Sequence, residues 1–236
     1  MSAAARVVVD LVPPPAGGAT AGATREWTGV AIDVLRASST LTAALEQGAA
    51  RVVPFATTGE AIRYRAANPG ALACGERGGR IVPGFDLGNS PSEFTAARVA
   101  GRTLAFASTN GSRAMLALAA CGERWLGAFV GAGALLARLA DAGRIRIVCA
   151  GKEGGFALED AACAGWIVSG LVARGAEAAN DAARFCASIA PRDAGEVRAL
   201  VEGSDHARTL TALGPDYAAD VRFCATLDAV GAAHPF

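Results

Sequence analysis

Short β-rich runs alternate with longer, Ala-rich amphipathic stretches along most of the 236-residue chain. Such alternation is typical of α/β proteins, in which helices cover the faces of a sheet. Hydrophobic residues make up 52% of the chain and charged residues 19%, which supports a large buried core. We therefore expect an α/β fold of mixed sheets layered with helices, built as one domain or as two intimately packed lobes.

Strands and helices are predicted from these runs. The β-rich runs predict strands over residues 6–12, 28–34, 51–55, 71–75, 102–107, 124–130 and 144–150. The amphipathic stretches predict helices over residues 39–47, 59–67, 91–100, 111–120 and 133–142, and an almost entirely helical region over 158–201. The Pro- and Gly-rich stretch 13–24 is interpreted as a surface loop, and the glycine-rich stretch 75–91 as a functional loop.

Charge and composition exclude several classes of protein. Lys+Arg and Asp+Glu are balanced at 22 each, so we predict no nucleic-acid partner. No run of about 18 apolar residues occurs, so we predict no membrane partner. The six cysteines are scattered singly, which indicates buried thiols in a reducing cytoplasm. His206 and His234 lie outside every polar motif and are assigned to the surface or the tail.

The first polar motif begins at Asp33, which follows a predicted buried strand. Open α/β sheets bind their ligands at the carboxyl ends of strands. The residues after Asp33 begin a helix, whose free N–H groups, together with the guanidinium of Arg36, predict a phosphate seat that includes Ser39. Asp33 could hold a metal ion or act as a nucleophile there. In the alternative interpretation, Asp33 and Ser38 cap the turn and Arg36 is solvated.

The second motif is the glycine-rich stretch 75–91, where glycines let the backbone approach a ligand closely. It carries two arginines, two carboxylates and an amide, namely Glu76, Arg77, Arg80, Asp86 and Asn89. Ser90, Pro91 and Glu93 read as a capping box that begins the next helix. Since Asp86 and Asn89 have no such capping role, they are candidates for ligand binding.

Two further strand ends carry polar residues. Thr109, Asn110 and Gly111 join a strand to a helix and offer donors for an oxyanion, although the same residues also fit an ordinary Asn-Gly turn. Lys152 follows the strand 144–150, and two adjacent acids, Glu159 and Asp160, begin the next helix. These acids either supply oxygen ligands to magnesium or favour the helix dipole.

Cys74 and Arg80 match the Cys-x5-Arg spacing of cysteine phosphatases, in which a thiolate attacks phosphorus. Glu76 would place negative charge within that loop and raise the pKa of the thiol, which opposes this chemistry. Ala73 also stands where a His usually precedes the cysteine, and Ile81 where a Ser or Thr usually follows the arginine. We therefore regard the spacing as a coincidence.

Taken in order, the motifs resemble the 2-phosphosulfolactate phosphatase family, often called ComB-like. The matching segments are residues 31–40, 75–79, 84–91, 109–111, 149–151 and 158–160, with weaker similarity around Ser204 and Asp220. The resemblance implies a single ComB-like phosphatase domain over residues 1–236, of α/β fold. It also implies magnesium-dependent hydrolysis of 2-phosphosulfolactate to sulfolactate and phosphate, as in coenzyme M biosynthesis.

This resemblance, together with the chemistry of the motifs, assigns a hypothetical role to each candidate residue. The catalytic candidates are Asp33, Arg36, Glu76 and Arg77. The substrate-binding candidates are Ser39, Arg80, Asn89, Ser90, Thr109, Asn110, Gly111 and Lys152. The candidate magnesium ligands are Asp33, Asp86, Glu159 and Asp160. The partner expected is a small anionic phosphorylated substrate. The apolar helical C-terminal third either covers the sheet or forms a dimer interface, and we predict a homo-oligomer.

Two alternatives remain open at this stage. The first is a phosphatase for another small phosphorylated hydroxy acid. The second is a relative that binds anions without turnover, although a pure anion binder gains nothing from carboxylates in its site. A panel of substrates distinguishes the first alternative from a phosphatase for 2-phosphosulfolactate. Phosphate binding without turnover would indicate the second.

Overall fold

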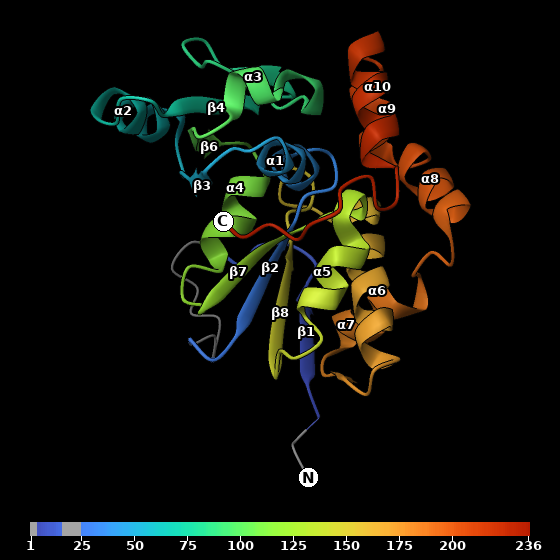
Figure 1. Cartoon of the computed structure of the whole chain (residues 1–236). Coiled ribbons are helices and arrows are strands. Elements are labelled where there is room, and N and C mark those ends of the chain that lie inside the picture. Colours follow the sequence, from blue (N-terminus) through green and yellow to red (C-terminus); the bar gives the residue numbers. More distant parts are fainter. Residues whose placement is uncertain (1–3, 16–24) are drawn as a thin grey trace.

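The computed structural model describes residues 4–15 and 25–236 (Figure 1). Residues 16–24 of the predicted loop 13–24 lie outside the described residues. The first sheet has five strands in the order β7-β2-β8-β1-β9, all parallel to their neighbours. Its strands are β1 (Arg6–Asp10), β2 (Thr28–Ile32), β7 (Glu123–Gly127), β8 (Arg144–Cys149) and β9 (Glu177–Ala178).

The second sheet has four strands in the order β3-β6-β4-β5. Its strands are β3 (Arg51–Pro54), β4 (Leu72–Arg77), β5 (Arg80–Ile81) and β6 (Thr103–Ala107). The first three strands of this order run parallel, whereas β5 folds back on β4 as an antiparallel hairpin, so the sheet is mixed. The α/β fold with layered, mixed sheets is therefore confirmed.

Helices cover both faces of the five-stranded sheet, and one helical layer lies between the two sheets (Figure 1). The side chains of β2 alternate between these layers, because successive residues of a strand point to opposite faces. Val30 and Ile32 pack in the core that includes α6, whereas Ala31 packs in the core between the sheets. The helices of these layers are α5 (Ala132–Arg138), α6 (Leu158–Val172) and α7 (Asp181–Ser188) on one face, and α1 (Ala37–Glu46) and α4 (Gly111–Ala117) between the sheets.

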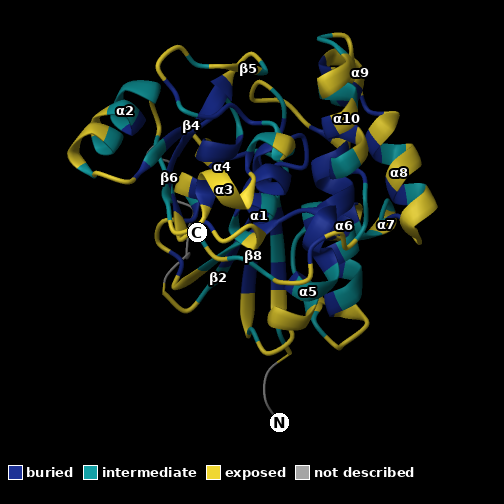
Figure 2. Cartoon of the chain, turned by 45° about the horizontal axis from the view of Figure 1, so that its top comes forward, coloured by how far each residue is buried: buried dark blue, intermediate teal, exposed yellow. Residues whose placement is uncertain are grey.

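The outer face of the second sheet is covered by α2 (Thr58–Ala67), which packs against β4 and β6. Helices α8 (Ala194–Glu202), α9 (Asp205–Thr211) and α10 (Pro215–Cys224) form a group beside both sheets. The chain then returns to β7, where the backbone N–H of Leu126 donates to the carbonyl of His234. Helix α6 is buried along most of its length, which makes it the central helix of the first core (Figure 2).

Several expected elements differ in the structure. The predicted helix 91–100 is a 3-10 turn, η1 (Pro91–Glu93), followed by the short α3 (Ala96–Val99). Phe94 interrupts the helix because its side chain is buried in the core between the sheets. The predicted helical region 158–201 contains the short strand β9, which pairs with β1. A second 3-10 turn, η2 (Phe129–Gly131), precedes α5.

The predicted capping box at Ser90 is wrong. The side chain of Ser90 makes no capping hydrogen bond and donates instead to Oδ1 of Asp220 at 2.6 Å. The carboxylate of Glu93 accepts a hydrogen bond from the backbone N–H of Gly88 rather than that of Ser90. Ser90 and Glu93 therefore bond to Asp220 and Gly88, in place of the reciprocal hydrogen bonds that a capping box requires. Within the described part of the chain, no helix combines the length and the apolar character that a membrane crossing needs.

Candidate active site

The carboxyl ends of strands from both sheets face one pocket of about 120 Å³. Strand β2 leads to Asp33 and Arg36, and β8 leads to Lys152 and Glu153. From the second sheet, β4 carries Glu76, and β6 leads to Thr109 and Asn110. The described lining is Asp33, Leu35, Arg36, Glu76, Gly78, Gly79, Asn89, Thr109, Asn110, Lys152, Glu153, His206, Thr209, Leu210 and Leu213. Ligand sites of open α/β sheets form at strand ends of this kind.

Asp33 lies on the pocket wall directly after β2, and its residue is almost fully buried. Oδ1 of its carboxylate accepts a hydrogen bond from the backbone N–H of Ala37 in the first turn of α1. Oδ2 receives no hydrogen bond from any donor in the described residues. The backbone of Asp33 is held by Ser38, whose hydroxyl accepts from the Asp33 N–H at 2.9 Å. The carboxylate is therefore fixed on one side and free on the other.

The environment of Asp33 disfavours a negative charge. Burial above all, together with the carboxylates of Glu76 and Glu159, raises the pKa of Asp33 from 3.8 to about 6. The nearby His206 and the N–H of Ala37 act in the opposite direction and lower this pKa. Such a carboxylate is stabilised by any cation that enters the pocket. A titratable group with a perturbed pKa inside a pocket is also a common feature of catalytic sites.

Arg36 is the buried cation of the pocket, with a side chain only 4% exposed. One terminal nitrogen, Nη1, donates to Oδ2 of Asp220 at 2.5 Å, and the other, Nη2, donates to the carbonyl of Gly79 at 2.8 Å. The guanidinium also lies over the ring of Tyr217, with 4.9 Å between Cζ and the ring centroid. The interpretation of Arg36 as a solvated residue is therefore wrong, because three groups hold it in place.

Glu76 connects two loops of the second sheet across the pocket. Its Oε1 accepts a hydrogen bond from the backbone N–H of Thr109, and its Oε2 accepts one from that of Gly79, both at 2.7 Å. Gly79 adopts a φ of +79°, which few residues other than glycine tolerate in a tight turn. Glu76 therefore fixes the geometry of the turn after β4 and of the loop after β6.

Two buried polar atoms on the pocket wall lack partners among the described residues. These are Oδ1 of Asn89 and Oγ1 of Thr109. A buried polar atom without a hydrogen bond costs about 1–3 kcal/mol, so such atoms are rare unless a ligand or water satisfies them. Asn89 and Thr109 were predicted to bind substrate, and their position in the pocket agrees with that role.

The outer rim of the pocket carries Lys152 and Asn110. Nζ of Lys152 donates to Oγ1 of Thr209 in α9 at 2.9 Å. Oδ1 of Asn110 accepts a hydrogen bond from the backbone N–H of Glu153 at 3.1 Å, which joins the loop after β6 to the loop after β8. Lys152 therefore supplies a second cation to the pocket, beside α9.

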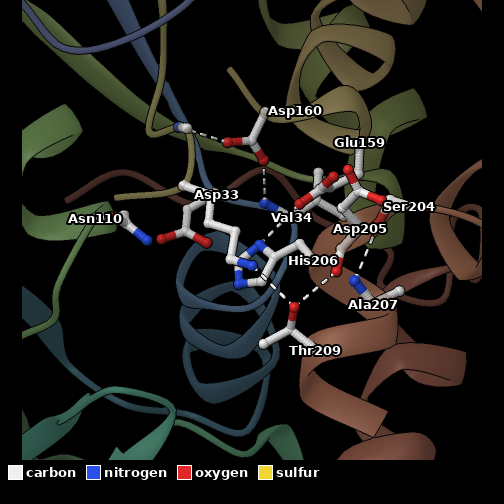
Figure 3. Close-up of polar contacts among 12 residues, drawn as sticks. Asp33, Val34, Asn110, Glu159, Asp160, Ser204, Asp205, His206, Ala207 and Thr209 are labelled. Atoms are coloured by element: carbon white, nitrogen blue, oxygen red, sulfur yellow. Dashed lines mark hydrogen bonds and ion pairs between the residues drawn. The ribbon is translucent and has the colours of Figure 1, made fainter. Parts of the chain in front are cut away.

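His206 was assigned to the surface, and this assignment is wrong. Its side chain is 13% exposed, lines the pocket, and extends from α9 toward Glu159 (Figure 3). Nδ1 of His206 lies 2.9 Å from Oε1 of Glu159, which stands in the first turn of α6. His206 lies far in sequence from Asp33, Glu76 and Lys152, and the position of α9 beside the sheets brings it to the same pocket. The weak resemblance at Ser204, two residues earlier, was the available signal.

Five of the predicted catalytic and substrate-binding residues do not line the pocket. The side chains of Arg77 and Arg80 are on the exposed β4–β5 hairpin, and Nη1 of Arg77 donates to the carbonyl of Glu76. Ser39 is fully buried and donates to the carbonyl of Val34. Ser90 binds Asp220, as described above. Gly111 has a supporting role, because it packs directly against the Asp33 carboxylate.

The four predicted magnesium ligands do not form one cluster. Oδ1 of Asp86 pairs with Arg65 at 3.0 Å and its Oδ2 accepts from the N–H of Ala73, both outside the pocket. The two oxygens of Asp160 accept from the backbone N–H groups of Val34 and Gly151, so this buried carboxylate joins the ends of β2 and β8 (Figure 3). Across residues 4–15 and 25–236, no group of three or more His, Cys, Asp or Glu is arranged to hold a metal ion.

Cys74 is fully buried in the core between the sheets and does not line the pocket. Burial, together with the carboxylates of Asp86 and Glu93, raises the pKa of its thiol well above the ordinary value. A nucleophilic cysteine needs the opposite shift and access to its substrate. The geometry therefore agrees with our rejection of the Cys-x5-Arg spacing.

Comparison with known sequences gives the family. The sequence model of the 2-phosphosulpholactate phosphatase family matches residues 18–233. A Deinococcus radiodurans protein named probable 2-phosphosulfolactate phosphatase is 40% identical over 199 residues, covering 83% of this chain and 82% of that protein. Proteins with the same name from Synechococcus sp. (strain JA-3-3Ab) and Thermotoga maritima are 37% and 36% identical, and cover 84% and 85% of both chains respectively. The chain therefore belongs to the 2-phosphosulpholactate phosphatase family.

Proposed function

We propose that this protein is a magnesium-dependent phosphatase that hydrolyses 2-phosphosulfolactate to sulfolactate and phosphate, a step of coenzyme M biosynthesis. The observation that carries the proposal is that Asp33 lines one pocket together with two cations, Arg36 and Lys152. The substrate carries phosphate, sulfonate and carboxylate groups, so it needs more than one cation. The names of the relatives support the same reaction.

The phosphoryl group binds at the inner end of the pocket, beside Arg36. The N–H groups of Arg36 that are not used by Asp220 and Gly79 are available to phosphoryl oxygens. The hydroxyl of Thr109 donates to the same group, and the Asn89 amide can turn so that its nitrogen donates as well. An anionic ligand at this end thereby gives the Thr109 hydroxyl an acceptor, and it accepts from the Asn89 amide nitrogen once that amide has turned.

The second anionic end of the substrate binds at the rim. Lys152 supplies the charge there, and the Thr209 hydroxyl that it contacts limits where its ammonium group can go. Asn110 faces the same space. A substrate that lacks the sulfonate would lose this charge pairing, and we expect its kcat/KM to fall about tenfold or more.

Magnesium fits the chemistry of Asp33. This carboxylate has one oxygen without a donor in the described residues, and its pKa is raised chiefly by burial, with the carboxylates of Glu76 and Glu159 adding to the rise. Mg²⁺ is commonly held by one or two protein carboxylates together with substrate oxygens, so no cluster of three ligands is required. Asp33 would hold the ion, which would neutralise charge on the phosphoryl oxygens. Whether Asp33 also orients the attacking water or attacks phosphorus itself stays open.

The test is phosphate release from 2-phosphosulfolactate by the wild type and by Asp33→Asn, with magnesium and with EDTA. We expect turnover that needs magnesium and is lost in the variant. Activity that survives EDTA would contradict the metal. Turnover of another phosphorylated hydroxy acid in place of 2-phosphosulfolactate would support the alternative substrate, and binding of phosphate without turnover of any ester would indicate the anion-binding alternative.

We also propose that the protein works in the cytoplasm and assembles as a homo-oligomer. All six cysteines are buried and free, a state that suits a reducing compartment. The oligomeric proposal rests on the apolar helical C-terminal third alone. Light scattering after size exclusion measures the mass of the particle, and a mass of 23.7 kDa would contradict it.

A further inference from the structure

Asp220 in α10 is a buried carboxylate that does not line the pocket. It contacts Arg36, which does. Its Oδ2 accepts a hydrogen bond from Nη1 of Arg36 at 2.5 Å, and its Oδ1 accepts one from the Ser90 hydroxyl at 2.6 Å. The side chains of Arg36 and Asp220 are only 4% and 5% exposed. Both oxygens of Asp220 are therefore engaged by side chains of this chain, and little of the carboxylate is exposed to water.

Helix α10 holds the guanidinium on a second side as well. Tyr217 lies one helical turn before Asp220, and residues three apart share a helix face. The Tyr217 ring lies under the guanidinium at 4.9 Å from Cζ, which restricts the plane of Arg36. The carbonyl of Gly79 takes a third position on this group. The orientation of the guanidinium of Arg36, a residue of the pocket lining, is thus determined by α10 and by the turn after β4.

We propose that Asp220 is a positioning residue that orients Arg36 for the phosphoryl group and sets how strongly the pocket binds phosphate. The proposal rests on the function proposed above, in which Arg36 contacts phosphoryl oxygens. A planar guanidinium binds an oxyanion through two parallel hydrogen bonds, so a small rotation of the group removes one of them. Asp220 itself does not line the pocket and acts through Arg36.

The discriminating experiment is a double-mutant cycle in the full-length chain, with Arg36→Ala, Asp220→Asn and the combination. Two quantities are measured: the Kd of inorganic phosphate by calorimetry, and kcat/KM for the phosphate ester. We expect Asp220→Asn to weaken both by about tenfold to a hundredfold in the wild-type background. In the Arg36→Ala background the same change should have no further effect, because the group that Asp220 orients is already gone. Equal losses in both backgrounds would overturn the proposal.

Two more variants separate positioning from folding. Asp220→Asn removes one partner of a buried ion pair, which can unfold the chain. Asp220→Glu keeps the charge and moves it by one methylene, so we expect a folded protein with phosphate binding weakened about tenfold. Asp216→Asn is the matched control, since Asp216 lies on the exposed side of the same helix. It should leave both quantities unchanged.

The phosphate Kd keeps this test separate from that of the reaction. If no ester is turned over but the cycle in phosphate affinity shows the expected coupling, the proposed function fails and the role of Asp220 stands. If the wild type hydrolyses the ester and Asp220→Glu is folded with wild-type affinity and kcat/KM, the positioning role is overturned while the function stands. A wild type that hydrolyses the ester but binds no inorganic phosphate would overturn the claim that Asp220 sets phosphate affinity, while the function would stand.

Discussion

A Cβ atom added to Gly111 would stand 2.6 Å from Oδ2 of Asp33, closer than such atoms approach one another in proteins. The same atom would meet the Cβ of Ala37 at 2.5 Å. The glycine that begins α4 is therefore what allows the Asp33 carboxylate to face the pocket. Its contribution is a contact rather than the ligand binding that the sequence suggested.

Gly111→Ala should displace Asp33 and lower kcat by about a hundredfold, because a shift of about 1 Å at a catalytic group has that effect. Overpacking should also cost about 1–3 kcal/mol of unfolding free energy. Phosphate release and urea unfolding measure the two quantities. Gly143→Ala is the matched control, since a Cβ at Gly143 meets nothing within 4 Å. Full activity of Gly111→Ala would contradict the contact.

The pKa of Asp33 predicts how stability depends on pH. This pKa is about 6 in the folded chain, above its ordinary value of 3.8, so the folded state binds more protons between these values. The free energy of unfolding of the wild type should therefore fall as pH rises from about 4 to about 6. Asp33→Asn removes this loss and should be more stable than the wild type at pH 7, by up to about 3 kcal/mol.

Urea unfolding of both proteins at a series of pH values checks this prediction. The two curves should approach one another at low pH, where the wild-type carboxyl is protonated. A variant that is less stable than the wild type at neutral pH would contradict it. A gain in stability together with a loss of activity is the expected behaviour of a charged group that is kept buried for catalysis.

Glu76→Gln should loosen the loop that carries Thr109. An amide can accept only one of the two backbone hydrogen bonds that the Glu76 carboxylate accepts, from Thr109 and Gly79. The other N–H then faces a second donor, and we expect a loss of about 1–3 kcal/mol in unfolding free energy. Chemical denaturation measures the loss, and Glu202→Gln, on an exposed position of α8, serves as the control. Equal stability of the two variants would show that the Glu76 contacts are weak.

Cys74→Ala should retain phosphatase activity. The thiol is buried and its pKa is raised, so it has neither the access nor the charge that a nucleophile needs. Treatment of the wild type with iodoacetamide should likewise leave the rate of phosphate release unchanged. A folded Cys74→Ala protein without activity would revive the interpretation of Cys74 and Arg80 as a cysteine phosphatase loop.

The parts of the site that could be predicted are those determined by local sequence. Asp33 follows an apolar run, and the end of this run predicts the end of the strand. Asn89 and Thr109 lie in turns whose composition indicates close backbone approach. For these residues, the local sequence alone predicts a position at the pocket.

The parts that could not be predicted depend on how distant elements pack. His206 and Asp220 belong to helices whose sequences resemble any amphipathic helix, and their meeting with Glu159 and Arg36 is a result of tertiary structure. Ser90 and Glu93 have capping spacing, yet Asp220 and Gly88 provide better partners than the local backbone does. A local capping preference is overridden where a buried polar group elsewhere in the fold competes for the same hydrogen bond.

The pocket takes Asp33 and Lys152 from one sheet, and Glu76 and Thr109 from the other. A gene exchange that replaced one sheet with that of a distant relative would join two surfaces that had never been selected together. The loss would fall on catalysis first, because the core of each sheet could survive the exchange while the facing loops could not. The two sheets therefore form one functional unit, and a chimera of this kind is expected to fold and to be inactive.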